Sequence, residues 1–318
     1  MKRRVVITGV AGFIGSNLAV RLLEEGFNVI GIDNLSYGRH EQIPAGVRFL
    51  EMDIRSPKLR DVIEPDDVIF HLAAKNCISD CQENPVETSD INVTGSVSVL
   101  EAARIKKAHK VIYAETSALY EGCQKLPSNE SEVSPQSFYA LSKFAEMKFV
   151  EGYQRFFGVR TTGLRYFNVY GPRQDYRRTI PPVMSAFIIN LLQGKRPVIY
   201  GSGQKRRDFV YVDDVNEFHL LCLQNSHTDN RTFNVGSAEN YSIQEIFEQI
   251  EGILKINLEP IYKTDLPGEA QETLADIQEA KSLGWAPKIF LKEGLKRSIA
   301  YIQDLVLPQL AKEEGGLK

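Results

Sequence analysis

Short apolar runs alternate with amphipathic stretches through the first half of the chain. The apolar runs cover residues 5–7, 29–32, 68–72 and 111–114, and a further strand is expected at residues 160–166. Helical patterns cover residues 17–25, 93–105 and 139–157, whereas a loop follows the second apolar run. Apolar strands separated by amphipathic helices are typical of a parallel sheet that is covered on both faces. The pattern predicts an α/β fold with a doubly wound, Rossmann-like parallel sheet.

The pattern changes after Asn168, where glycines and prolines interrupt the chain. Gly171-Pro172 and Pro181-Pro182 lead into a mixed region. Helical stretches recur there at residues 183–192, 243–253 and 291–305. We expect a sheet domain over residues 1–168, to which a segment near 208–236 returns. A smaller C-terminal α/β domain is expected mainly over residues 169–318.

The composition is that of an ordinary globular protein, with 43% hydrophobic and 25% charged residues. The 38 basic and 41 acidic residues give a net charge of −3, so no overall field attracts nucleic acid or an anionic membrane. The apolar run near the N-terminus is too short for a signal peptide or a membrane span. We therefore expect a cytoplasmic protein with neither nucleic acid nor membrane as partner.

The four cysteines are too few and too scattered for a disulfide framework; they are Cys77, Cys81, Cys123 and Cys222. No cluster of histidines or further cysteines accompanies them at the spacing of a zinc site. We expect reduced thiols and no bound metal.

A glycine-rich turn, Thr8 to Gly15, follows the first strand and opens the first helix. Gly9 allows a tight turn, Gly12 lets the backbone approach a pyrophosphate, and Gly15 lets the helix pack closely on the strand. The helix N-terminus then offers amide donors to phosphate oxygens. Asp33 ends the second strand, where a carboxylate grips a ribose hydroxyl and repels a 2′-phosphate. These features favour NAD over NADP as cofactor.

Tyr139 and Lys143 stand four residues apart, so their side chains share one face of the predicted helix. A tyrosine with a pKa near 10 is a poor base at neutral pH. A neighbouring ammonium group favours the phenolate and makes the pair suitable for proton transfer.

These motifs belong to an ordered series that runs through most of the chain. The series comprises residues 8–15, Asp33-Asn34-Leu35, Asp53-Ile54, residues 71–74, 92–95, 139–143, 164–173, 207–215, 233–236 and 283–285. In this series the chain resembles the NAD-dependent nucleotide-sugar epimerase/dehydratase family of extended short-chain dehydrogenase/reductases, and UDP-hexose 4-epimerases in particular.

The resemblance implies a role for many single residues. It implies cofactor contacts at Gly9, Gly12, Phe13, Ile14, Gly15, Asp33, Asn34, Asp53, Ile54, Leu72, Ala73, Ala74, Asn92, Tyr139, Lys143 and Tyr166. It also implies that Tyr139 is the base, that Lys143 holds the nicotinamide ribose and that Thr116 bonds the reacting sugar oxygen. Asn168 and Arg207 are expected to bind the nucleotide-sugar.

Several positions depart from the family pattern near the expected site. Ser117 and Ala118 replace the acid and base that 4,6-dehydratases carry, so dehydration loses support. Glu115 and Glu121 stand where small residues are usual, and the segment from Lys75 to Cys77 is also unusual. In the late loop, residues 266–269 lack an arginine that often contacts phosphate.

The sequence therefore predicts a nucleotide-sugar 4-epimerase that acts through a transient 4-keto sugar and tightly bound NAD. An NAD-dependent oxidoreductase on the same substrate class, or a uronic-acid 4-epimerase, is the enzymatic alternative. A protein that only senses NAD is the non-enzymatic alternative, although it has no need of Thr116, Tyr139 and Lys143 together.

The helix after Tyr139 carries two apolar stripes, although covering the sheet requires only one. One stripe contains Leu141, Ala145, Phe149 and Phe156, and the other contains Phe144, Met147, Val150 and Phe157. The helix at residues 93–105 shows a similar surplus. We expect a homodimer in which these helices form a four-helix bundle, with Met147 and Val97 among the contacts.

Overall fold

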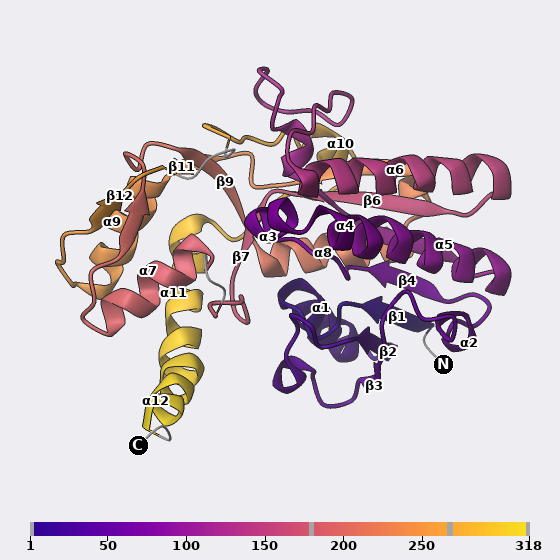
Figure 1. Ribbon diagram of the computed structural model, residues 1–318, viewed down its shortest axis with the longest axis horizontal. Coiled ribbons are helices and arrows are strands. Elements are labelled where there is room, and N and C mark those ends of the chain that lie inside the picture. Colours follow the sequence, from indigo (N-terminus) through magenta and orange to yellow (C-terminus); the bar gives the residue numbers. More distant parts are fainter. Residues whose placement is uncertain (1–2, 178–180, 266–269, 316–318) are drawn as a thin grey trace.

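The computed structural model describes residues 3–177, 181–265 and 270–315, and its centre is a seven-stranded parallel sheet (Figure 1). The strands, in sequence order, are β1 (Arg4–Thr8), β2 (Asn28–Asp33), β3 (Arg48–Glu51), β4 (Val68–His71), β5 (Lys110–Thr116), β6 (Thr161–Tyr166) and β10 (Arg231–Val235). Their spatial order is β10-β6-β5-β4-β1-β2-β3. This order confirms the predicted doubly wound, Rossmann-like sheet, because it reverses between β1 and β4.

Helices cover both faces of the sheet. One face packs against α1 (Phe13–Glu24) and α8 (Val212–Gln224), and the other packs against α2 (Leu59–Val62), α5 (Gly95–Lys106) and α6 (Phe138–Phe157). Successive residues of β1 alternate between the two cores: Val5 and Ile7 face the α1 side, whereas Val6 faces the α5 side. Both faces are therefore buried under helices, which explains why the strands are almost uniformly apolar.

The C-terminal half builds a second apolar core beside the sheet, on the left in Figure 1. Its helices are α7 (Val183–Leu192), α9 (Ile243–Leu254), α11 (Leu291–Tyr301) and α12 (Leu307–Gly315). Its strands form one small sheet of β7 (Asn168–Tyr170), β9 (Arg206–Tyr211) and β11 (Asn240–Ser242), and another of β8 (Val198–Tyr200) and β12 (Ile261–Lys263). Short helices elsewhere are α3 (Ile78–Glu83), α4 (Pro85–Ser89) and α10 (Gln278–Ser282).

The sequence analysis missed several elements, among them β3 and α8. Strand β3 occupies the stretch that was expected to be a loop, because an edge strand with two exposed and two half-buried residues leaves no apolar run. Helix α8 occupies much of the segment near 208–236, of which only β10 joins the main sheet. Its buried residues Val215, Phe218, His219 and Cys222 do follow a helical spacing.

Two buried aspartates fasten the late segments of the chain to earlier ones. The Asp208 carboxylate accepts hydrogen bonds from the amides of Ser237 (2.6 Å) and Ala275 (3.0 Å). The Asp214 carboxylate accepts from the amides of Lys288 (3.0 Å) and Ile289 (2.9 Å). These bonds keep the C-terminal segments against the sheet.

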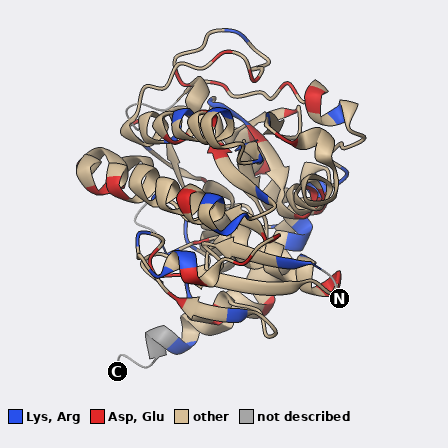
Figure 2. Cartoon of the chain, turned by 90° about the vertical axis from the view of Figure 1, so that its right-hand side faces the viewer, with Lys and Arg blue, Asp and Glu red and all other residues tan. Residues whose placement is uncertain are grey.

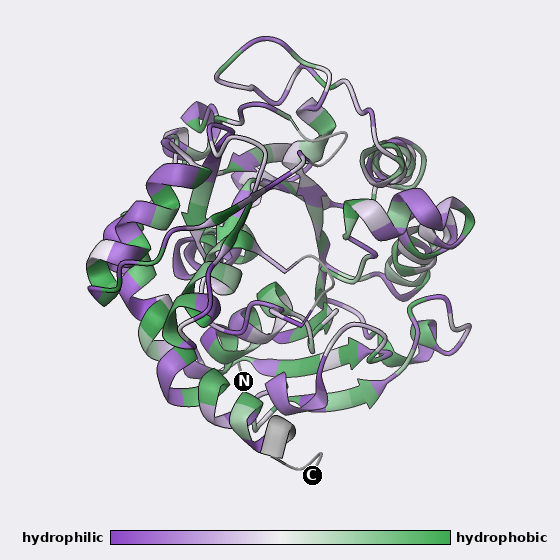
Figure 3. Ribbon diagram, turned by 60° about the vertical axis from the view of Figure 1, so that its left-hand side comes forward, coloured by the Kyte–Doolittle hydropathy of each residue, from purple (hydrophilic) through white to green (hydrophobic). Residues whose placement is uncertain are grey.

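Charged residues of both signs are scattered over helices and loops (Figure 2), while the strands of the main sheet are largely hydrophobic (Figure 3). All four cysteines carry thiols without a disulfide. Within the described ranges, no helix combines the length and the apolar character that crossing a bilayer requires. Over the same ranges, no group of three or more potential metal ligands comes together.

His219 lies on α8 and is fully buried. Its Nε2 is 2.6 Å from the Tyr166 hydroxyl, and its ring stacks edge-on against Phe70. Burial lowers the pKa of His219 to about 3, from an ordinary value of 6.5. The unfolded chain therefore takes up a proton below pH 6.5 that the folded chain excludes, and stability falls as the pH drops from about 6.5 to about 3.

We expect His219→Phe to flatten this pH dependence. A histidine held neutral lowers the unfolding free energy by roughly 1.4 kcal/mol per pH unit below 6.5. Between about pH 6.5 and pH 5, the variant should therefore lose about 2 kcal/mol less unfolding free energy than the wild type. Urea unfolding at both pH values measures the slope. His227→Phe, at an exposed position, is the control and should retain the wild-type slope. Equal slopes in all three proteins would contradict the prediction.

Candidate functional site

A cavity of about 500 Å³ opens at the carboxyl ends of the parallel strands, where the strand order reverses. Residues of the main sheet line one side, and residues after Asn168 line the other. This edge of a doubly wound sheet is where such folds bind their ligands, and the volume suits a cofactor with a substrate beside it.

The glycine-rich turn forms the floor of the cavity. Gly9 has a φ of +77°, and a Cβ there would lie 2.8 Å from the amide nitrogen of Ala73. A Cβ on Gly15 would lie 2.1 Å from the carbonyl oxygen of Gly9, so helix and turn meet this closely only because residue 15 is glycine. Gly12 is the N-cap of α1 and offers no side chain to its first amides. Phe13 and Ile14 line the cavity, as expected of a helix end that receives a pyrophosphate.

Backbone amides of the glycine-rich turn and of the loop after β2 hold the Asp33 side chain in place. Its two carboxylate oxygens accept hydrogen bonds from the amides of Ala11 (3.0 Å) and Leu35 (2.9 Å). Burial raises the pKa of Asp33, while these two bonds lower it. Asn34 extends the wall by donating to Asp53 at 3.0 Å. The hydrogen bond from Arg55 holds the pKa of Asp53 well below its usual range, so that carboxylate is ionised.

Most residues expected to contact the cofactor line the cavity. They are Gly9, Gly12, Phe13, Ile14, Gly15, Asp33, Asn34, Asp53, Ile54, Leu72, Ala73, Ala74, Tyr139, Lys143 and Tyr166. Asn92 is different, because its buried side chain binds the backbone of Lys75 and donates to Ser142 Oγ at 2.9 Å. Asn92 thus supports the cavity wall from behind. The turn, the carboxylate of Asp33 and the helix end together fit a dinucleotide.

The three expected catalytic residues line one part of this cavity. Thr116 ends β5, and its Oγ1 accepts a hydrogen bond from the amide of Ala118 at 3.1 Å. Tyr139 and Lys143 come from the first turns of α6, with Lys143 almost completely buried. The helix starts at Ser137, whose hydroxyl caps the amide of Ala140 at 3.1 Å.

Glu121 fixes the start of α6 and was not recognised as a functional residue from the sequence. Its Oε2 accepts hydrogen bonds from the amides of Gln136 (3.1 Å) and Ser137 (2.8 Å), and its Oε1 accepts from the Ser137 hydroxyl (3.0 Å). A carboxylate at a helix N-terminus is favourable because the amide dipoles point toward it. Glu121 therefore helps to place Tyr139, which lies two residues beyond the cap.

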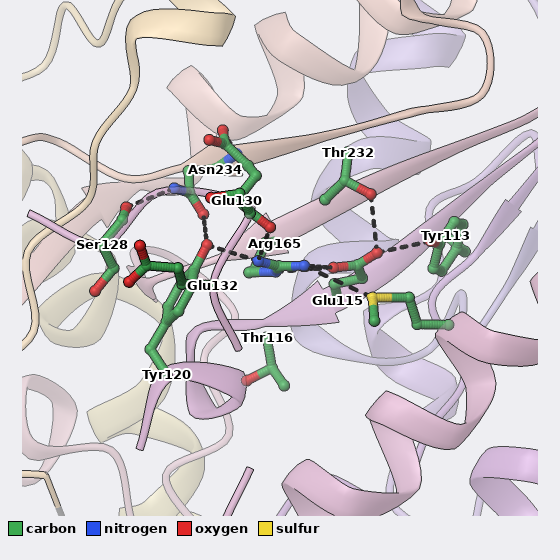
Figure 4. Close-up of polar contacts among 12 residues, drawn as sticks. Tyr113, Glu115, Thr116, Tyr120, Ser128, Glu130, Glu132, Arg165, Thr232 and Asn234 are labelled. Atoms are coloured by element: carbon green, nitrogen blue, oxygen red, sulfur yellow. Dashed lines mark hydrogen bonds and ion pairs between the residues drawn. The ribbon is translucent and has the colours of Figure 1, made fainter. Parts of the chain in front are cut away.

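Glu115, the other unusual acid, lines the cavity, but its carboxylate is buried and bonded to side chains of the sheet. Figure 4 shows its carboxylate directed toward Arg165, whose Nε donates at 2.8 Å, and toward the Tyr113 hydroxyl at 2.6 Å. Burial opposes the charge of Arg165, but Glu115 keeps the pKa of this guanidinium above its ordinary value. Gly163 leaves room for the pair, since a Cβ there would lie 2.5 Å from Glu115 Oε1.

The far end of the cavity contains the residues expected to bind the nucleotide-sugar. Asn168 lines it and donates to the carbonyl oxygen of Asp208 at 3.1 Å. Arg207 also lines it and donates to the carbonyl oxygen of Arg206 at 2.9 Å. Lys75 is buried in the wall and forms an ion pair with Glu87. The unusual residues 266–269 lie outside the described part of the chain.

The loop after β2 supplies lining residues that the sequence analysis did not select: Ser36, Tyr37, Gly38, Arg39 and Gln42. The Arg39 amide donates to the carbonyl oxygen of Ala11 at 3.0 Å, which draws the loop over the glycine-rich turn. The sequence could have pointed to this loop, because it follows the carboxyl end of a strand that lies close to the point where the strand order reverses.

Comparisons with known proteins agree with this geometry. The sequence model of the NAD dependent epimerase/dehydratase family matches residues 5–236. The putative UDP-glucose 4-epimerase of Methanocaldococcus jannaschii is 37% identical over 304 residues, which are 94% of this chain and 98% of that protein.

Solved structures are similar over nearly the whole chain. UDP-glucose 4-epimerase from Thermotoga maritima, solved with UDP-glucose, has a TM-score of 0.91 and 33% identity, and covers 95% of this chain and 99% of its own. UDP-glucuronic acid 4-epimerase from Bacillus cereus, solved with UDP-glucuronic acid and NAD, has a TM-score of 0.86 and 28% identity at the same coverage.

We expect Glu121→Ala to loosen the start of α6. The variant leaves two amides and a hydroxyl without their acceptor, which should lower the unfolding free energy by about 1–3 kcal/mol and speed amide exchange at Ala140. Urea unfolding and hydrogen exchange measure both effects. Glu132→Ala, at an exposed position of the same loop, is the control and should change stability by less than about 0.5 kcal/mol. If the two variants behave alike, Glu121 does not fix the helix start.

Proposed function

The chain belongs to the NAD-dependent epimerase/dehydratase family with NAD as its cofactor, and from this we propose that it inverts C4 of a nucleotide-sugar, with a UDP-hexose as substrate. The observation that carries the proposal is the grouping of Thr116, Tyr139 and Lys143 on one cavity, with the neighbouring acids engaged elsewhere. Such a site can move one proton at one sugar oxygen, while Ser117 and Ala118 stand where elimination would need an acid and a base.

In the proposed reaction, Tyr139 takes the proton of the C4 hydroxyl as a phenolate, which the Lys143 ammonium stabilises. The Thr116 hydroxyl bonds the same sugar oxygen and holds C4 in place. NAD, when bound, would supply the acceptor for the C4 hydrogen with its electron pair, and the donor that restores it on the opposite face of the turned 4-keto sugar. Tyr139 then gives its proton back to the oxygen, so the protein ends each cycle unchanged.

We assign the two sides of the cavity to the two halves of the ligand set. Residues 1–168, with 208–236, form the NAD-binding domain in this assignment, and residues 169–318 mainly bind the substrate. Gln174, Arg207 and Thr273 support it, because they come from the second half of the chain and line the cavity. A guanidinium such as that of Arg207 can bond two oxygens of a diphosphate at once.

A uronic-acid 4-epimerase is the second candidate, since the Bacillus cereus relative was solved with UDP-glucuronic acid. Both candidates use the same proton transfer at C4 and differ in the substituent at C5. A net oxidoreductase would instead release reduced cofactor, and a sensor of NAD would turn over no sugar at all.

The test is a screen of UDP-, GDP-, CDP- and dTDP-linked hexoses and uronic acids for inversion at C4. NMR monitors each reaction, and no NAD is added. We expect inversion of a UDP-hexose by protein that copurifies with NAD. Inversion of only a uronic acid would select the second candidate. Stoichiometric NADH release would select the oxidoreductase, and a 4-keto-6-deoxy product would show a dehydratase.

We expect Tyr139→Phe to lower kcat by about 10²–10⁴-fold while NAD binding persists, because the variant removes only the proton acceptor. Tyr153→Phe removes a hydroxyl from the same helix that bonds Glu101 at 3.2 Å, and it is the matched control. A kcat of Tyr139→Phe within about threefold of the wild type would rule out Tyr139 as the base.

We further propose that the protein is a homodimer joined through α5 and α6, which pack side by side (Figure 1). Leu141, Phe149 and Phe156 form a stripe on the outer face of α6, and their side chains are 44%, 48% and 72% exposed. A run of large apolar side chains in water favours burial against a second copy. Met147, expected among the contacts, is instead buried and lies 3.8 Å from the Arg165 guanidinium.

We expect Phe149→Glu to convert a dimer of about 72 kDa into the 35.9 kDa monomer, because it places charge in the middle of the stripe. Light scattering at micromolar concentration measures the mass. Phe290→Glu, which alters a 69% exposed phenylalanine before α11, is the control and should leave the dimer intact. A wild-type mass near 36 kDa would contradict the proposal at once.

A further inference from the structure

Glu146 is a fully buried carboxylate directly behind the candidate catalytic pair. Its side chain is 1% exposed and forms an ion pair with the Lys143 ammonium. The carboxylate also lies 3.8 Å from His71 Nε2, and Ser96 of α5 packs beside it. Nothing in the proposed reaction uses this acid, although burying a charge is costly unless another group compensates it.

The neighbours of Glu146 identify Lys143 as that compensating charge. His71 is neutral, because burial and the Lys143 charge lower its pKa to about 3, and its Nδ1 and Nε2 lie 2.8 Å from Thr8 Oγ1 and Ser96 Oγ. Glu115 and Tyr113 face the same region, but Glu115 is paired with Arg165. Burial raises the pKa of Glu146 above its ordinary value, although the Lys143 ammonium opposes this rise.

The three side chains lie in sequence along α6. Tyr139, Lys143 and Glu146 occupy positions i, i+4 and i+7, which share one face of a helix. The ammonium group is therefore placed between a phenol, at the end that faces the cavity, and a carboxylate, at the end that faces the core. The Tyr139 phenol and the Glu146 carboxylate therefore interact with the same positive charge.

We propose that Glu146 is a positioning residue that anchors the Lys143 ammonium and limits how much of its charge acts on Tyr139. This inference rests on the proposed role of Tyr139 as the proton acceptor. In this inference the basicity of Tyr139 depends on a residue outside the cavity, because Glu146 acts on Tyr139 through Lys143.

The sign of the effect follows from electrostatics. Removing the negative charge of Glu146 leaves the Lys143 charge undiminished, so the Tyr139 phenolate becomes more stable and its titration moves to lower pH. Seven residues of helix separate the two groups by about 10 Å. At that distance and an effective dielectric constant of about 20, one charge shifts a titration by about one pH unit.

The experiment titrates the Tyr139 phenol in the NAD-loaded protein, by the ultraviolet absorbance difference between each protein and its Tyr139→Phe counterpart. This readout needs no substrate. Glu146→Gln should titrate about one unit below the wild type, and Glu146→Asp, which keeps the charge but withdraws it by one methylene, should lie between them. The pH profile of kcat/KM should shift in the same order.

A titration of Glu146→Gln at or above the wild-type position would overturn the inference, because it would mean that Glu146 does no more than pack. If Glu146→Gln does not fold, Glu146→Asp must still titrate below the wild type. A shifted titration without any epimerisation would sustain the role of Glu146 and reject the proposed function. Epimerisation with an unshifted titration would do the reverse.

Discussion

Gly9 and Gly15 meet so closely that a Cβ on Gly15 would lie 2.1 Å from the Gly9 carbonyl oxygen. This approach seats α1 against the end of β1, and it lets the Gly9 amide reach the carbonyl oxygen of Ile32 at 2.8 Å. The neighbouring amide of Ala11 then reaches Asp33, so the turn and the second strand form one rigid wall. Gly9, Gly15 and Asp33 all line the cavity, so this wall depends on the glycine contact.

Behind the opposite wall, two ion pairs lie between the sheet and α6: Arg165 with Glu115, and Lys143 with Glu146. Buried pairs of this kind add little net stability, because desolvation offsets most of their attraction. They do restrict geometry, since each charge tolerates only positions in which its partner remains in contact. Thr116 follows Glu115 directly and Lys143 is itself one of the charges, so the candidate site inherits this restriction.

The sequence predicted the sheet and nearly all of the cofactor wall, because periodic apolar runs and a glycine-rich turn are local signals. It did not predict β3, whose pairing with β2 depends on tertiary context. The acids of the site were harder still. Nothing in the sequence around Glu115 or Glu121 says whether a carboxylate enters the cavity or turns away, since Arg165 and Ser137 are their partners only in the folded chain. The burial of Asn92 and Met147 likewise depends on contacts that form only in the folded chain.

The two buried aspartates of the late segments bear on how the chain matures during synthesis. Asp208 obtains a donor from Ala275, 67 residues later, and Asp214 obtains one from Ile289, 75 residues later. Until residues 288 and 289 have left the ribosome, the Asp214 carboxylate lacks both of these amide donors and must stay in water, because a buried acceptor without donors is costly. A nascent chain that ends before residue 270 also lacks Ala270 and Thr273, which line the cavity. The lining is complete only when most of the polypeptide has emerged, so a ligand meets its full set of contacts late in synthesis.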